Sequence, residues 1–108
     1  MRFISGIALA TCLALPVGAE AVELGDVKKG QEYARANCVE CHEVEPIESF
    51  SPNPDAPSFQ EVAEQPGMNA RALAVWLQSS HPTMPNLIIE PAEMDNVIAY
   101  ILSLKKKS

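Results

Sequence analysis

The stretch "RANCVECHEV", residues 35–44, constrains this chain more than any other part of its sequence. It places Cys38 and Cys41 three residues apart and follows the second cysteine directly with His42. On a helix, positions i, i+3 and i+4 share one face, so a helix continued through this stretch would point both thiols and the imidazole at a single object. The rest of the fold must therefore accommodate whatever these three side chains hold.

Four kinds of site use two cysteines at this spacing. A c-type haem is attached through Cys-x-x-Cys-His, whose imidazole then reaches the iron. A redox dithiol is normally carried on a βα unit, and no strand pattern precedes this helix. A zinc ion needs two further ligands, and His81 is the only other histidine. A structural disulfide across so short a gap would close almost no loop. The motif favours one covalent haem c on Cys38 and Cys41, with His42 as an iron ligand.

The beginning of the chain is typical of an export signal. One basic residue precedes an apolar run that ends at Leu15, and small residues follow. The run is too short to span a bilayer. We expect cleavage after Ala19, with Ala21 as the alternative. Residues 1–19 would then be a signal peptide and residues 20–108 the mature periplasmic domain.

Cys12 lies in the segment that cleavage would remove. The sequence "LATC" loosely resembles a bacterial lipoprotein site, but Thr11 is larger than the residue usual before a lipidated cysteine. A better cleavage site also follows downstream. We therefore expect a soluble exported protein with no transmembrane segment in the mature chain and with both remaining cysteines in the motif.

The charge of the chain limits its partners. The formal net charge is −6, and loss of the signal, which holds one arginine and no acid, makes it more negative. Nucleic acid is thus an unsuitable partner. An acidic protein is steered toward basic docking surfaces, with rates that fall as salt rises. The lysines at positions 105–107 are expected to form a solvated tail after the last helix.

The residue patterns predict an all-α domain of three or four short helices joined by long loops. The first helix should begin after Asp26 as its cap and continue to about Cys41. A short helix is expected over residues 58–65, and another after the cap Asn69. The last should begin at Pro91 and carry one apolar stripe. So small a domain with so much loop needs a large bound group to fill its centre.

The sequence closely resembles the class I monohaem c-type cytochromes along essentially its whole mature length. The segments "GQEYARANCVECH", "APSF", "HPTMPNL" and "VIAYILSL" occur in the order found in that family. The resemblance implies a small cytochrome c-like fold wrapped around one covalently attached haem. It implies that the first and last helices cross, with Gly30 receiving the ring of Tyr100. It also implies that the carbonyl of Pro57 accepts the second nitrogen of His42, which would fix the ring and increase its basicity.

The opposite side of the iron needs a second ligand. We assign it to Met84, because this residue lies in a proline-stiffened loop and the family places its sulfur ligand in such a "MP" dipeptide. Met94 falls on the apolar stripe of the last helix and is expected to be core, and Met68 lacks flanking rigidity. His81 is the competing ligand, since imidazole also binds haem iron well. The loop cannot present both His81 and Met84 to one iron.

With protein ligands on both faces, the iron has no position for a substrate, so we expect a one-electron carrier and not an enzyme. Apolar packing near the haem is expected from Trp76, Leu77, Phe59, Leu87 and Ile98. The partners would be redox proteins, and the chain would be a monomer or a subunit of a redox complex. The alternatives are a haem c subunit of a larger periplasmic oxidoreductase complex and a ligand-binding haem sensor. Mitochondrial family members dock through lysine-rich faces, and lysines are scarce here, so their partners do not transfer.

Overall fold

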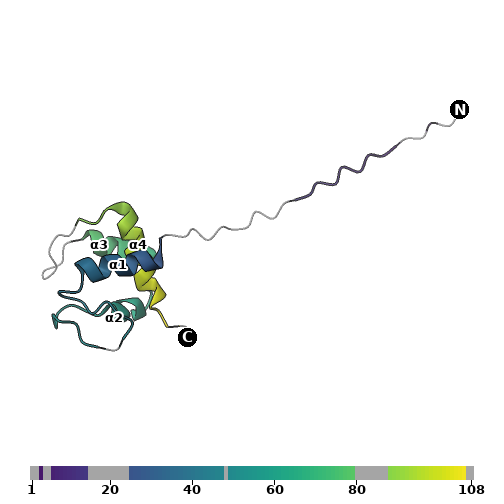
Figure 1. Ribbon diagram of the computed structural model, residues 1–108. Coiled ribbons are helices and arrows are strands. Elements are labelled where there is room, and N and C mark those ends of the chain that lie inside the picture. Colours follow the sequence, from purple (N-terminus) through teal and green to yellow (C-terminus); the bar gives the residue numbers. More distant parts are fainter. Residues whose placement is uncertain (1–2, 4–5, 15–24, 48, 80–87, 107–108) are drawn as a thin grey trace.

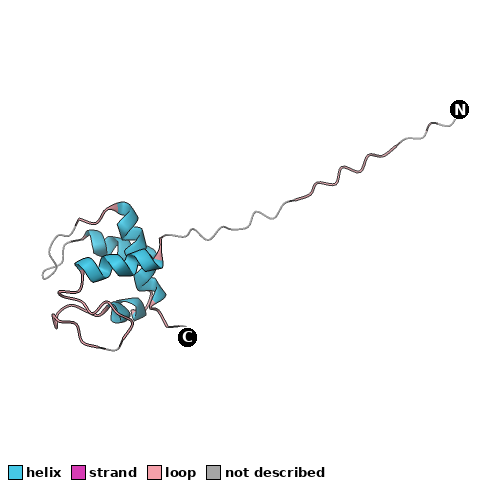
Figure 2. Cartoon of the chain, in the orientation of Figure 1, coloured by secondary structure: helices cyan, strands magenta, loops and turns pink. Residues whose placement is uncertain are grey.

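The computed structural model describes residues 3, 6–14, 25–47, 49–79 and 88–106 (Figure 1). Within that part of the chain the regular structure is entirely helical, and no strand is present (Figure 2). The helices are α1 (Val27–Asn37), α2 (Phe59–Glu64), α3 (Ala70–Gln78) and α4 (Pro91–Ser103). The prediction of an all-α fold with short helices and long loops is confirmed.

The N-terminal apolar run is described over residues 6–14, where it is exposed and has no regular structure. The expected cleavage sites at Ala19 and Ala21 lie outside the described residues. None of the described helices is both long enough and apolar enough to cross a membrane.

Each helix begins at a residue that caps it or that favours its first position. The carboxylate of Asp26 caps α1, and the side chain of Asn69 caps α3. Pro91 opens α4 at a position that needs no amide donor. Ser58 and Glu61 form a reciprocal capping box at α2, with side-chain-to-amide distances of 3.1 and 2.9 Å. The predicted starts of α1, α3 and α4 are confirmed.

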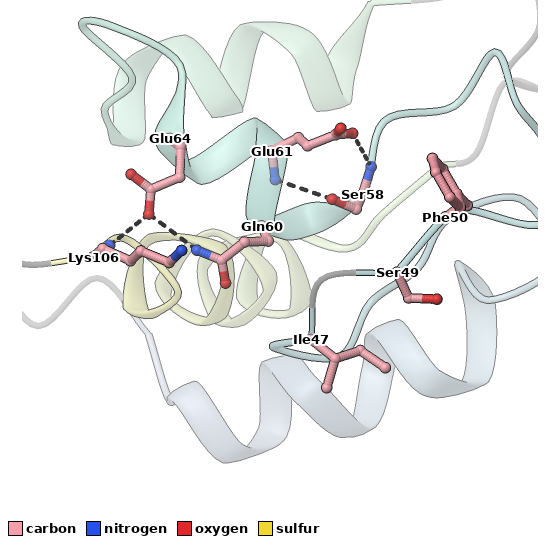
Figure 3. Close-up of a pocket in the computed structure, with 8 residues that line it drawn as sticks. All are labelled: Ile47, Ser49, Phe50, Ser58, Gln60, Glu61, Glu64 and Lys106. Atoms are coloured by element: carbon pink, nitrogen blue, oxygen red, sulfur yellow. Dashed lines mark hydrogen bonds between the residues drawn. The ribbon is translucent and has the colours of Figure 1, made fainter.

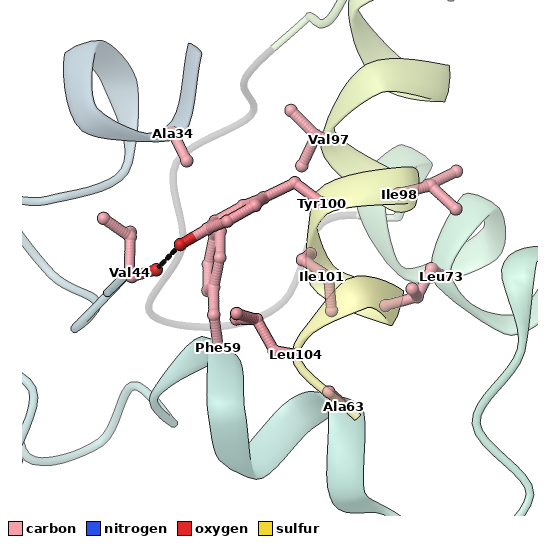
Figure 4. Close-up of a cluster of buried hydrophobic side chains, with 10 residues drawn as sticks. All are labelled: Ala34, Val44, Phe59, Ala63, Leu73, Val97, Ile98, Tyr100, Ile101 and Leu104. Carbon is pink, nitrogen blue, oxygen red and sulfur yellow. Dashed lines mark hydrogen bonds between the residues drawn. The ribbon is translucent and has the colours of Figure 1, made fainter. Parts of the chain in front are cut away.

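Helix α4 is the centre of the molecule, since it packs against each of the other three helices. Its apolar stripe faces inward and meets side chains from α1, α2, α3 and the loop after α1 (Figure 4). The buried cluster consists of Ala34, Val44, Phe59, Ala63, Leu73, Val97, Ile98, Tyr100, Ile101 and Leu104.

The crossing of α1 and α4 depends on a bare stretch of backbone at Gly30. A Cβ atom there would lie 1.9 Å from the carbonyl oxygen of Asn96 and 2.8 Å from the Cβ of Tyr100. The expected contact between the first and last helices is therefore confirmed, but the Tyr100 ring is not what Gly30 receives. The hydroxyl of Tyr100 donates to the carbonyl of Val44 in the loop after α1 (Figure 4). Gly30 instead admits the α4 backbone itself.

Candidate functional site

The cysteine motif begins at the end of α1 and not within it. Cys38 is the C-terminal cap of the helix, and the side-chain amide of Asn37 donates to the Tyr33 carbonyl at 2.9 Å. The expectation that α1 continues to about Cys41 is thus wrong, because a short polar side chain that bonds the backbone favours a helix end. One further turn follows, in which the amides of Cys41 and His42 donate to the Cys38 carbonyl at 3.3 and 2.9 Å. That turn keeps the three side chains within one helical repeat.

The two thiols are free and half-buried. Burial raises the pKa of the Cys38 thiol to about 11, so at neutral pH it is protonated. Dithiols that exchange disulfides depend on a lowered thiol pKa, so the redox reading of the motif is disfavoured. Among the residues that the structure describes, no three His, Cys, Asp or Glu side chains gather as a metal cluster. The zinc reading gains no support there either.

The imidazole of His42 is oriented by the backbone. Its Nδ1 lies 2.6 Å from the carbonyl oxygen of Pro57, and because a carbonyl only accepts, Nδ1 donates and carries the proton. Nε2 then has a lone pair available for a metal ion. The ring also lies 5.5 Å from that of Phe59, measured between centroids. A covalently attached haem requires two thiols about one turn apart for its thioether links and a neighbouring imidazole for its iron, and these three groups are present here.

The loop after the motif is more ordered than its proline-rich sequence indicates. The amide of Asn53 donates to the Cys41 carbonyl at 3.2 Å, and the amide of Phe59 donates to the Glu43 carbonyl at 2.9 Å. The Glu43 amide donates in turn to the hydroxyl of Ser51 at 3.0 Å. The loop therefore folds back on the motif, and this brings the Pro57 carbonyl to the imidazole.

A charged contact beside the motif was not anticipated from the sequence. The guanidinium of Arg35 donates to both carboxylate oxygens of Glu45, and the amide of Gln31 donates to one of them at 3.2 Å. The hydrogen bonds from Arg35 hold the pKa of Glu45 below its usual value. Arg35 and Gln31 lie four apart on α1, so the carboxylate meets one face of that helix. No local spacing rule pairs Arg35 with a residue ten positions away in a loop.

The predicted second ligand cannot be placed, because Met84, together with His81 and Leu87, lies outside the described residues. Met68 and Met94 are both half-buried and pack against the hydrophobic core. The expectation that Met94 is a core residue is confirmed.

The apolar residues expected around the cofactor fall into two groups. Phe59 and Ile98 are buried, and Leu77 is half-buried against the same core. Trp76 differs, since 57% of its surface is exposed and the helical core does not include it.

A separate hollow of about 410 Å³ lies between α2, the loop around Ile47 and Phe50, and the chain after α4 (Figure 3). Its polar side includes Glu64, whose carboxylate accepts from the amide of Lys106 at 2.6 Å. None of the cysteines or histidines of the motif lines this hollow, so it is distinct from the candidate site.

Comparison with known proteins gives one family. The model of the family described as Cytochrome c matches residues 27–105. A protein of Bradyrhizobium diazoefficiens described as cytochrome c-552 is 32% identical over 96 residues, which cover 87% of this chain and 91% of that protein. No solved structure matches the chain significantly. The matched range contains the motif, the loop that follows it and the four helices of the described residues.

Proposed function

The chain belongs to the cytochrome c family, whose members carry covalently attached haem c, and from this premise we propose that it is a periplasmic one-electron carrier. The observation that carries the proposal is the hydrogen bond between His42 Nδ1 and the Pro57 carbonyl, at 2.6 Å, beside two thiols one turn apart. This arrangement leaves Nε2 of His42 as an iron ligand.

Each residue of the site has a distinct task in this proposal. Cys38 and Cys41 attach the haem through thioether bonds, and His42 ligates the iron from the same side. The Pro57 carbonyl holds the imidazole in one tautomer and increases its basicity. When bound, the haem supplies the ferric and ferrous states between which one electron is exchanged. The chain limits reorganisation by keeping the imidazole fixed in both states.

Met84 is proposed as the second axial ligand. Its neighbours "HPTMPNL" include two prolines, which restrict the loop and leave this methionine without a helical stripe to fill. The other candidate thioethers, Met68 and Met94, pack against the core. A thioether ligand favours the ferrous state and so raises the reduction potential relative to two histidines. With both axial positions filled by protein, electron transfer is the activity that remains, and no enzymatic role is proposed.

The proposed location rests on the apolar N-terminal run, and the proposed partners rest on the charge of the chain. The apolar N-terminal run supports export to the periplasm by a signal peptide, residues 1–19. The acidic surface, with a net charge of −6 for the whole chain, supports redox partners with basic docking faces and disfavours nucleic acid. Encounter rates with such partners should fall as the salt concentration rises.

The decisive measurement is the visible spectrum of the purified, exported protein in both redox states. Met84→Ala should abolish the methionine-to-iron signature in the ferric spectrum, while the matched variant His81→Ala in the same loop should retain it. An unchanged spectrum in Met84→Ala would remove the methionine from the proposal. Carbon monoxide binding by the reduced wild-type protein at neutral pH would contradict the role of electron carrier and would indicate a ligand-binding sensor. A native mass of twice the monomer or more would instead indicate a subunit of a complex.

A further inference from the structure

We propose that Arg35 is a positioning residue for His42, which it affects through Glu45. The inference rests on the proposed function, because it takes His42 as the iron ligand whose orientation matters. The guanidinium holds the segment that follows His42 against α1, and that segment determines where the imidazole lies. No ligand contact of Arg35 itself is involved.

The Glu45 carboxylate is held from two sides along one helix face. Arg35 donates to it through Nε and Nη2, the latter 3.0 Å from Oε2, and Gln31 Nε2 lies 3.2 Å from the same oxygen. The backbone of Glu45 is restrained as well, since its amide donates to Oε1 of Glu43 at 3.0 Å. A two-point guanidinium contact fixes direction as well as distance, which a lysine at this position would not do.

Three consecutive residues after His42 are each bound to a different helix. The carbonyl of Glu43 accepts the amide of Phe59 at the start of α2. The carbonyl of Val44 accepts the Tyr100 hydroxyl from α4. Glu45 is bound to α1 by the contacts just described. Residues 43–45 are thus bound to α2, α4 and α1, and the contact between Glu45 and α1 is the third of these restraints.

The orientation of the imidazole depends on the same segment at both of its ends. His42 is joined covalently to Glu43, and its Nδ1 bonds to Pro57, which lies two residues before Phe59. The Phe59 amide bonds to the Glu43 carbonyl, so Glu43 is linked both to the His42 ring and to the segment that carries the Pro57 carbonyl. Movement of Glu43 therefore changes the position of the imidazole, of its acceptor, or of both. Of the three contacts that bind residues 43–45 to the helices, that of Glu45 is the one that is not part of the core, and freeing Glu45 removes it.

Exposure separates this role from a general contribution to stability. Phe59 and Tyr100 are 5% and 2% exposed, so their contacts belong to the core. The side chains of Arg35 and Glu45 are 53% and 32% exposed. Exposed pairs contribute little to global stability. Loss of Arg35 should therefore loosen the loop locally and leave the helical core closed.

The test uses the reduced, haem-loaded protein labelled with ¹⁵N, and it follows solvent exchange of the His42 Nδ1 proton and the Phe59 amide by NMR. Arg35→Gln should accelerate both by about two- to fivefold, the range expected for an exposed pair, with core amides such as that of Ile101 unchanged. Arg71→Gln removes the same charge from an exposed position on α3 and should change neither. Glu45→Gln should match Arg35→Gln, and the double variant should add nothing further.

The charge-swapped variant Arg35→Glu with Glu45→Arg should slow the exchange of both protons part of the way back to the wild-type rate. Such a recovery is expected if the ion pair restrains the loop, and it is not expected if each side chain acts on its own. Exchange at His42 in Arg35→Gln equal to that in Arg71→Gln would overturn the proposal. So would faster exchange spread evenly over the core, because it would make Arg35 an ordinary stabilising residue. Failure of the proposed function is recognised separately, by a wild-type visible spectrum without histidine-ligated haem. The exchange rates of the His42 and Phe59 protons report the Arg35–Glu45 contact whatever the ligands of the iron are.

Discussion

Gly30→Ala should destabilise the protein, although alanine is the better helix former. A Cβ at this position would lie 1.9 Å from the carbonyl oxygen and 2.5 Å from the carbonyl carbon of Asn96. Both are backbone atoms of α4, so no side-chain rotation can relieve the clash. The helices α1 and α4 would have to separate by about 1 Å, and the Cβ of Tyr100, at 2.8 Å, would have to move with them.

Two effects of opposite sign determine the size of the change. Overpacking a close contact costs about 1–3 kcal/mol, and the backbone partner places this site toward the upper end. Replacing glycine by alanine inside a helix gains about 1 kcal/mol in propensity. We therefore expect the free energy of unfolding to fall by about 1–2 kcal/mol, and each kcal/mol corresponds to about 4–8 °C in Tm for a domain of this size.

The measurement is urea and thermal unfolding of the haem-loaded protein. Ala36→Gly, the reverse exchange at an exposed position in the last turn of the same helix, tests the propensity effect and should cost at most about 1 kcal/mol. The close approach of the helices would be refuted if Gly30→Ala raised the free energy of unfolding by as much as Ala36→Gly lowers it.

Three smaller predictions concern other contacts. Tyr100→Phe leaves the buried Val44 carbonyl without its donor and should lower the free energy of unfolding by about 1–3 kcal/mol in urea titration, whereas an unchanged midpoint would mean that water replaces the hydroxyl. Ser58→Ala removes the cap of α2 and should cost about 1 kcal/mol, with Ser58→Thr close to wild type. Because Arg35 lowers the pKa of Glu45, this pair stabilises the fold above the pKa of an unfolded glutamate, about 4.3, and the contribution is lost as pH falls through the lower folded value. The stability difference between wild type and Glu45→Gln should therefore shrink below about pH 4.3, and a constant difference from pH 7 to pH 3 would contradict this.

The helix starts were predictable because each depends on residues within four positions of one another. The Asp26 and Asn69 caps and the Pro91 start are local events, and the tertiary fold does not alter them. The end of α1 was predicted too late. The i, i+3, i+4 spacing of Cys38, Cys41 and His42 is compatible with a helix, but a single turn beyond the helix end satisfies it equally well.

The contacts around the site were less predictable, since they join residues that no periodicity relates. Tyr100 and Val44 are 56 positions apart, and Arg35 and Glu45 are ten apart across a change from helix to loop. The ring of Tyr100 was placed at Gly30 because family resemblance identifies the crossing, but not which atoms meet there. A close approach of two backbones is decided by the crossing geometry, which the sequence indicates only through the glycine itself.

The central position of α4 has a consequence for the order in which the chain can fold. Helices α1, α2 and α3 each pack on α4, which is the last helix in the sequence. A chain that emerges from its N-terminus first cannot complete its core until residues near 100 have arrived, so its early folding is limited by contacts of long sequence separation. During that interval the Cys38 side chain, half-buried in the finished fold, is open to solvent. The segment after α1 therefore stays open to solvent until the last helix of the sequence has joined the core.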